Sequence, residues 1–141
     1  MGISMSGWEM TDMAYDRLRT EVDAPFGETV ERVRAALSEQ GFGVLTEIDV
    51  QATLRAKLGE EMEDYLILGA CNPPLAHRAI EADRSIGLLL PCNVVVRTEG
   101  ARTVVQAMDP QAMVELTGLE RIKGVADEAT VGLEAALASL T

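Results

Sequence analysis

The segment YLILGACNPPLAH, residues 65–77, decides the fold because an apolar strand in it runs directly into a helix. Leu66, Ile67 and Leu68 put apolar side chains on both faces, which indicates a central strand covered on both sides by helices or by a second subunit. Asn72 is a favoured N-cap residue, and Pro73 suits the first helical position because its missing N–H costs nothing there. The sequence therefore predicts a strand over residues 61–70 and a short helix over residues 72–85.

A second apolar segment, IGLLLPCNVVVR, covers residues 86–97. We expect one long strand broken at Pro91, because proline cannot donate to a sheet ladder and marks a bulge, a bend or an edge. The turn TEGA and the run RTVVQAM, residues 98–108, complete a hairpin. The two segments contain the only cysteines, Cys71 and Cys92, and an asparagine follows each of them.

Hydrophobic periodicity predicts the remaining elements. Residues 15–23 alternate as a strand with one apolar face, and residues 42–50 form another strand. Residues 24–43 contain an amphipathic helix that stops at Gly41, with Asp23 as its expected N-cap. Residues 51–59 form a short helical turn, residues 109–118 form a loop or one short turn, and residues 119–140 form a long helix. This order predicts a mainly antiparallel sheet with its helices gathered on one face.

Length and composition limit the kind of protein. At 141 residues, we expect residues 1–13 to be a frayed or expression-derived tail and residues 14–141 to form one domain. A net charge of −11 argues against nucleic acid as a partner, because the field of the chain repels phosphate. No apolar run reaches the roughly 18 residues of a membrane span, and no signal peptide is recognisable, so we expect a cytoplasmic protein without membrane insertion.

The motifs CNPPLAH and GLLLPCNVVV, in this order and separation, resemble those of the domain of unknown function 302 family, as do ETVERVRAALSEQGFGVLTEIDV and the later MDP. The resemblance covers roughly residues 15–140. It implies an α+β fold of the TATA-binding-protein-like type: a curved, mainly antiparallel sheet of about five strands, two main helices on one face and a short inserted helix. It also implies a homodimer, and lipid or other small-ligand binding is a suggestion for the family. DNA binding is not implied, because the fold label describes topology only.

The two cysteines have a structural and a functional interpretation. Both can be small buried residues, since free cysteine is among the most buried residue types. Alternatively, Cys71 near a helix N-terminus has a stabilised thiolate, and Cys92 beside Pro91 lies close to it if the two strands are neighbours. A reversible disulfide or a soft-metal site is then possible.

Pro91 and four further residues complete the candidate ligand site. Asn72 and Asn93 either satisfy backbone groups locally or line a pocket with the cysteines. His77, the only histidine, forms an ordinary i,i+4 pair with Glu81 or lies at the rim of the pocket. Lys57 is a solvated lysine or faces an anionic ligand.

We therefore expect a non-catalytic domain that binds a small apolar or anionic ligand between the sheet and a helix, with no cofactor. The site we predict contains Lys57, Cys71, Asn72, His77, Pro91, Cys92 and Asn93. Two alternatives remain open. One is a thiol-dependent redox or metal-handling protein that uses both cysteines, and the other is a protein interaction module.

Overall fold

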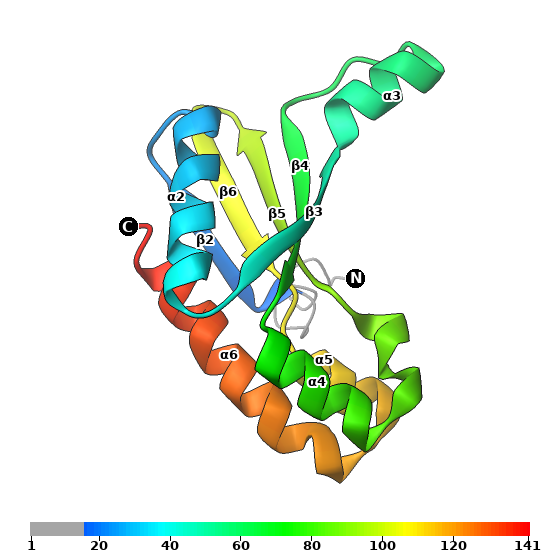
Figure 1. Ribbon diagram of the computed structural model, residues 1–141. Helices are drawn as coiled ribbons and strands as arrows, with labels where there is room; N and C mark the ends of the chain where they lie inside the picture. Colours follow the sequence, from blue (N-terminus) through cyan, green and yellow to red (C-terminus); the bar gives the residue numbers. More distant parts are fainter. Residues whose placement is uncertain (1–15) are drawn as a thin grey trace, which may run out of the picture.

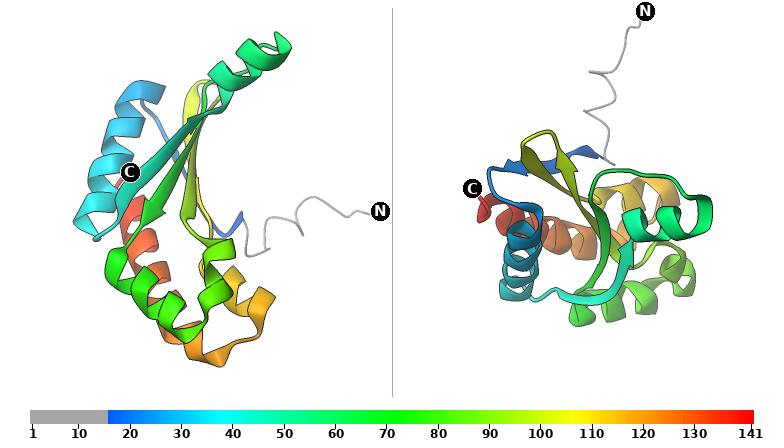
Figure 2. Two further views of the ribbon diagram at one scale, coloured as in Figure 1. Left: turned by 45° about the vertical axis from the view of Figure 1, so that its right-hand side comes forward. Right: turned by 90° about the horizontal axis from the view of Figure 1, so that it is seen from above.

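The fold is an open five-stranded antiparallel sheet with helices packed on one face (Figures 1 and 2). The computed structural model describes residues 16–141, so the expected tail over residues 1–13 lies outside the described part. The strands are β2 (Leu18–Val22), β3 (Gly43–Asp49), β4 (Tyr65–Cys71), β5 (Cys92–Glu99) and β6 (Arg102–Ala107). Their order across the sheet is β2-β6-β5-β4-β3, and every neighbouring pair is antiparallel. This confirms the predicted fold class.

Two main helices cover one face of the sheet, as predicted. The helices are α2 (Phe26–Glu39), α3 (Val50–Leu58), α4 (Pro73–Ala82), α5 (Gln111–Thr117) and α6 (Lys123–Ala138), with the short 3-10 helices η2 (Arg84–Leu89) and η3 (Glu120–Ile122). Helix α2 packs on α6, and the pair contacts the same side of the sheet (Figure 1). Helices α4 and α5 lie against the lower part of α6, whereas α3 projects from the far end of β3 and β4 (Figure 2).

Helix α2 follows its predicted periodicity but begins differently. Val30, Val33 and Leu37 are buried on the stripe that faces the core. The N-cap is Pro25 rather than Asp23, and no side chain caps the helix. The Thr29 hydroxyl donates to the Pro25 carbonyl at 2.9 Å within the first turn. The prediction of Asp23 was wrong because the preceding strand and turn continue through residue 24. Gly41 does end the helix, with a φ of +84° that favours glycine.

The junction between β4 and α4 forms as predicted. The Asn72 side chain accepts a hydrogen bond from the Leu75 N–H at 3.3 Å, and prolines occupy the first two helical positions. The inner face of β4 is fully buried at Leu68 and nearly so at Leu66. The outer face is only half-buried at Ile67, because the helices cover one side of the sheet alone.

The segment over residues 86–97 differs from the single broken strand that we expected. Residues 84–89 form η2, and the strand begins only at Cys92. An apolar run fits a buried helical turn as well as a strand, and here Ile86 is buried from a helical turn. The peptide bond between Leu90 and Pro91 is cis. The irregular strand pairing lies elsewhere in the sheet: the register of β3 against β4 shifts between Val44 and Thr46 of β3.

The C-terminal segment contains more helix than we expected. Residues 111–117 form α5 rather than a loop or one short turn, and η3 precedes α6. The predicted apolar stripe of α6 is confirmed, with Ala126, Ala129 and Leu133 buried. Gly132 permits a close approach, because a Cβ there would lie 2.9 Å from the Phe42 ring. Over residues 16–141, no helix has both the length and the apolar character needed to cross a membrane.

Candidate functional site

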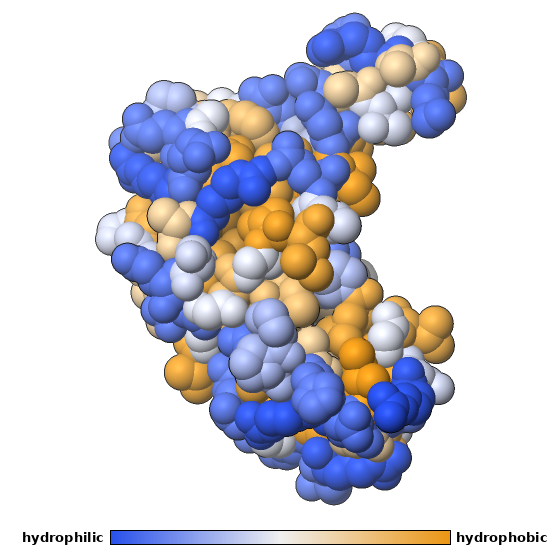
Figure 3. All heavy atoms as spheres, in the orientation of Figure 1, coloured by the Kyte–Doolittle hydropathy of each residue, from blue (hydrophilic) through white to orange (hydrophobic). Residues whose placement is uncertain are grey.

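A cavity of about 320 Å³ opens beside the end of β4, among α4, α6 and the segment that enters β5. Figure 3 shows hydrophobic atoms in the middle of the visible surface, between the hydrophilic surfaces of α2 and α4. The lining side chains are almost all hydrocarbon or sulfur. They are Phe42, Leu45, Thr46, Ala70, Cys71, Asn72, Leu75, Ala76, Ala79, Ile80, Leu90, Pro91, Cys92, Met113, Val125 and Ala129.

Small side chains on two facing helices leave this space open. Ala76 and Ala79 of α4 and Ala129 of α6 each present only a methyl group to the cavity. Asn72 fixes where α4 begins, because its side chain caps the helix directly after β4. The cavity therefore follows from the abrupt strand-to-helix junction and from the three alanines that the two helices contribute to its walls.

The opposite wall depends on a glycine in β4. A Cβ on Gly69 would lie 2.1 Å from Thr46 Oγ1 and 2.9 Å from Pro91 Cγ, so no other residue fits there without a shift. Gly69 pairs with Thr46 of β3 and with Asn93 of β5. Because position 69 has no side chain, Thr46 and Pro91 close over the sheet and form part of the cavity wall.

Both cysteines, at the end of β4 and the start of β5, are lining residues of the same cavity. Cys92 pairs with Ala70 across β4 and β5, so Cys71 is one residue from the register partner of Cys92. Both cysteines are free; Cys71 is half-buried and Cys92 is 9% exposed. Burial and, to a smaller extent, the charge of the Cys71 thiolate together raise the pKa of the Cys92 thiol to about 11. Cys92 is therefore a weak nucleophile at neutral pH, since the thiolate is the reactive form.

Four of the seven predicted site residues meet at this cavity: Cys71, Asn72, Pro91 and Cys92. Asn93 follows Cys92 in β5, but its side chain is exposed and outside the lining, and its carbonyl accepts from the Met108 N–H at 3.0 Å. Asn93 therefore pairs with a backbone N–H through its own main-chain carbonyl and not through its side-chain amide.

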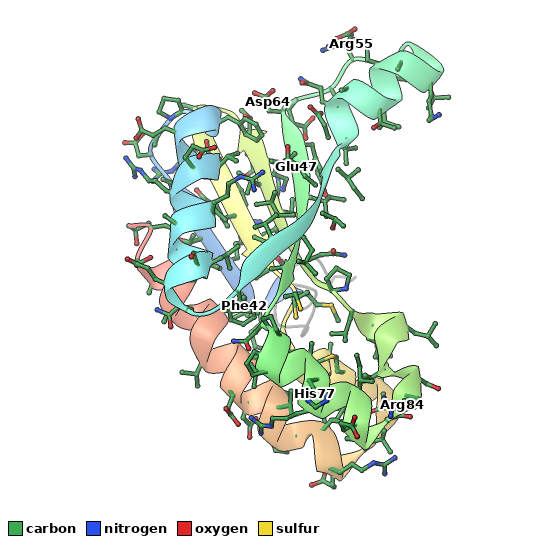
Figure 4. All side chains as sticks on the ribbon, in the orientation of Figure 1. Phe42, Glu47, Arg55, Asp64, His77 and Arg84 are labelled. Carbon is green, nitrogen blue, oxygen red and sulfur yellow. The ribbon has the colours of Figure 1, made fainter. Side chains whose placement is uncertain are left out.

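The other two predicted residues lie away from the cavity. His77 is 75% exposed on α4, and its Nε2 lies 3.4 Å from Glu81 Oε1, which is the ordinary surface pair (Figure 4). Lys57 is exposed on α3 and is not a lining residue. Figure 4 shows Arg55, on the same helix, at the opposite end of the molecule from His77.

Sequence reasoning missed most of the hydrophobic wall. Phe42, in the connection before β3, Met113 of α5, and Val125 and Ala129 of α6 come from three separate segments that only the tertiary structure brings together. Their apolar character predicted burial, but no sequence signal showed that they would surround a space. Within residues 16–141, no group of three or more His, Cys, Asp or Glu side chains is arranged to hold a metal ion.

Comparisons with known proteins agree with this fold. Residues 18–140 match the family described as "Domain of unknown function DUF302". The structure is similar to the crystal structure of an uncharacterized conserved DUF302 protein from Bacillus stearothermophilus. That comparison gives a TM-score of 0.82 at 29% sequence identity, and covers 87% of this chain and 96% of the other. No curated protein matches the sequence.

The expected likeness to TATA-binding protein stays a prediction, whereas the family itself is shown by a match over nearly the whole described chain. The chain belongs to the DUF302 family, whose description assigns no activity.

Proposed function

We propose that this domain binds a small, uncharged and largely apolar molecule in the cavity beside α4. The observation that carries the proposal is the lining, which is hydrocarbon and sulfur except for the Thr46 hydroxyl and the Asn72 amide. Ligand pockets typically occupy about 300–1,000 Å³ and combine apolar walls with a few polar groups that orient the ligand. A cavity of about 320 Å³ with two neutral polar groups fits the lower end of that description.

The charge of the site favours a neutral ligand over an anionic one. None of the lining residues is lysine, arginine or histidine, and the chain carries a net charge of −11. An anion would leave water without a compensating positive charge, which is costly in an apolar site. Lys57, the cation that we expected near an anionic ligand, lies on α3 instead.

Binding rather than catalysis fits the side chains of the cavity. General acid–base catalysis needs a titratable group near the reacting atoms, and the two cysteines are the only titratable residues of the lining. Since burial raises the pKa of Cys92, a redox mechanism in which Cys92 is the attacking thiol is disfavoured. In this proposal the protein is a cytoplasmic binding protein without a chemical step, which cell fractionation would test.

Filling the cavity is expected to abolish ligand binding. Ala79 is 1% exposed and lines the cavity, so the phenyl ring of Ala79→Phe would occupy the space that a ligand needs. Titration with the uncharged fluorescent probe 1-aminoanthracene measures the effect. We expect saturable binding to the wild type and none to Ala79→Phe. The matched control is Ala56→Phe, because Ala56 is exposed on α3 and distant from the lining. Undiminished probe binding by a folded Ala79→Phe variant would contradict the proposal.

We also propose that two copies of the chain associate through β3 and the outer face of the sheet. Within residues 16–141, strand β3 pairs only with β4 and its other edge is open, and Leu45 and Ile48 on it are 68% and 50% exposed. Ile48 is the register partner of Ile67 in β4, and Ile67 is the register partner of Val95 in β5. Ile67 and Val95 are half-buried, so the three residues form one apolar row across the sheet. An apolar row that leads to an open strand edge is a surface that a second chain can cover.

A charge on that edge is expected to separate the two copies. Ile48→Glu would bury a carboxylate at the proposed contact, and we expect sedimentation equilibrium to change from a dimer mass to a monomer mass. Leu88→Glu is the control, because Leu88 is 88% exposed on η2 and outside this row. A monomeric wild type would overturn the dimer and would favour a different protein partner for the same surface.

A further inference from the structure

Among residues 16–141, only two of the residues that line the cavity are exposed, and they mark its mouth. Leu45 is 68% exposed and Thr46 is exposed as well, whereas the other lining residues are all buried or half-buried. Both exposed residues belong to β3, which is an edge strand of the sheet. The cavity therefore opens to solvent along this edge strand.

A bulge in β3 explains why two consecutive residues reach the same cavity. Successive side chains of a regular strand point to opposite faces of the sheet, so a regular β3 would offer only one of them. Between Val44 and Thr46 the register of β3 against β4 shifts, and Leu45 is the extra residue without a partner. An extra residue of this kind bends the strand and redirects its side chains. The bulge thus adds Leu45 to the cavity from an open strand edge.

The mouth of the cavity coincides with the contact proposed above for two copies of the chain. Leu45 belongs both to the lining and to the open edge, whereas Ile48 belongs to the edge alone. In Figure 1 no other element lies in front of the middle of β3, and Figure 3 shows hydrophobic atoms on the surface there. A chain that covers the edge of β3 therefore also covers the mouth of the cavity.

The charges of β3 suit a second copy in antiparallel orientation. Its two charged side chains, Glu47 and Asp49, are both acidic and lie in its C-terminal half. Parallel pairing would place the acidic halves of two copies side by side, and like charges that face one another are destabilising, whereas antiparallel pairing separates them. Such a two-fold contact uses the same surface of both copies. Because Thr46 is the middle residue of Gly43–Asp49, both mouths lie near the centre of the contact.

We propose that a second copy of the chain completes the ligand site, by covering Leu45 and Thr46 and closing the cavity over its ligand. This inference rests on the apolar site and on the β3 contact proposed above. Closing the mouth removes further apolar surface of the ligand from water, so the dimer binds the ligand more tightly than the monomer does. The ligand in turn tightens the dimer by the same factor, because coupling between two binding equilibria is reciprocal.

The variant Ile48→Glu tests the coupling, because Ile48 lies on the β3 edge but does not line the cavity. Binding of 1-aminoanthracene is titrated at a protein concentration at which the wild type sediments as a dimer and the variant as a monomer. We expect the variant to bind the probe about tenfold more weakly, within the range of about 5–150-fold that is typical of coupled sites. The control Leu88→Glu should bind as the wild type does, because Leu88 lies on η2 and outside the lining.

Sedimentation equilibrium of the wild type, with and without saturating 1-aminoanthracene, is the reciprocal measurement. We expect the probe to lower the dissociation constant of the dimer by the factor found in the titration. It should leave the dimer of Ala79→Phe unchanged, because the phenyl ring fills the cavity of that variant. Should Ile48→Glu not fold, as judged by circular dichroism, the wild type is diluted below the dissociation constant of its dimer, and its affinity for the probe must then fall.

Equal affinity for the probe in the wild-type dimer and in folded, monomeric Ile48→Glu would overturn the inference and leave the apolar site standing. A monomeric wild type that binds the probe would overturn it together with the β3 contact. A dimeric wild type that binds no probe would overturn it through the failure of the apolar site. The three failures are therefore distinguishable from one another.

Discussion

Replacing Leu68 with alanine is expected to lower the free energy of unfolding by about 2–5 kcal/mol. Leu68 lies in the middle of β4, is fully buried, and belongs to the core between the sheet and the helices. Its removal takes away apolar contacts and leaves a space that the neighbouring strands cannot close, because β3 and β5 hold β4 on both sides. Urea unfolding followed by circular dichroism measures the loss.

The matched control for this substitution is Leu88→Ala on η2. The Leu88 side chain is 88% exposed, so its truncation removes little buried surface. We expect a change within about 0.5 kcal/mol, as for most surface substitutions. A loss at position 68 no larger than that at position 88 would show that β4 is not in the core.

The Cys92 thiol is expected to react about 100-fold more slowly with iodoacetamide in the native protein than in the unfolded chain near neutral pH. Burial raises its pKa from the ordinary 9.0 to about 11, which leaves about 100-fold less thiolate at any pH below both values. In a Cys71→Ser background only one thiol remains, and intact mass measures its labelling with and without urea. Equal rates in the two states would contradict the buried position of Cys92.

The same shift makes part of the stability depend on pH. Because the folded-state pKa of Cys92 lies above the unfolded value, its contribution is fully present below pH 9 and is lost as pH rises through about 11. The unfolded chain releases the proton first, so alkali favours unfolding. We expect Cys92→Ala to show a smaller loss of stability than the wild type between these two pH values. An identical loss in both proteins would assign the pH dependence to other groups.

Local patterns predicted most of the fold. The alternation of β2, the stripe of α2 and the stripe of α6 are all confirmed, because periodicity records which face of an element is buried. The cap at Asn72 is confirmed because it depends on neighbouring residues alone. The predictions for the residues of η2 and α5 were wrong for a common reason. The apolar residues in these two segments are compatible with several local structures, and packing against the rest of the protein selects the helical one.

Only part of the candidate site was predicted from the sequence. The sequence indicated Cys71 and Cys92 as a pair; both line the cavity, but the register of β4 and β5 puts Ala70, and not Cys71, opposite Cys92. It also grouped His77 and Lys57 with them, but His77 is on the outer surface of α4 and Lys57 is on a helix that projects from the sheet. Nearness along the chain does not give the direction of a side chain, which is fixed by the helix on which it lies.

The sequence by itself determined the family, the antiparallel sheet, the two main helices and the strand-to-helix junction at Asn72. Those features depend on short-range chemistry: hydrophobic periods, caps and turns that each involve a few adjacent residues. Only the tertiary structure decided that a cavity exists and that Met113, Phe42 and Ala129 line it with the two cysteines. A cavity is space left between elements that are distant in sequence, so it depends on how their surfaces fit and not on any one segment.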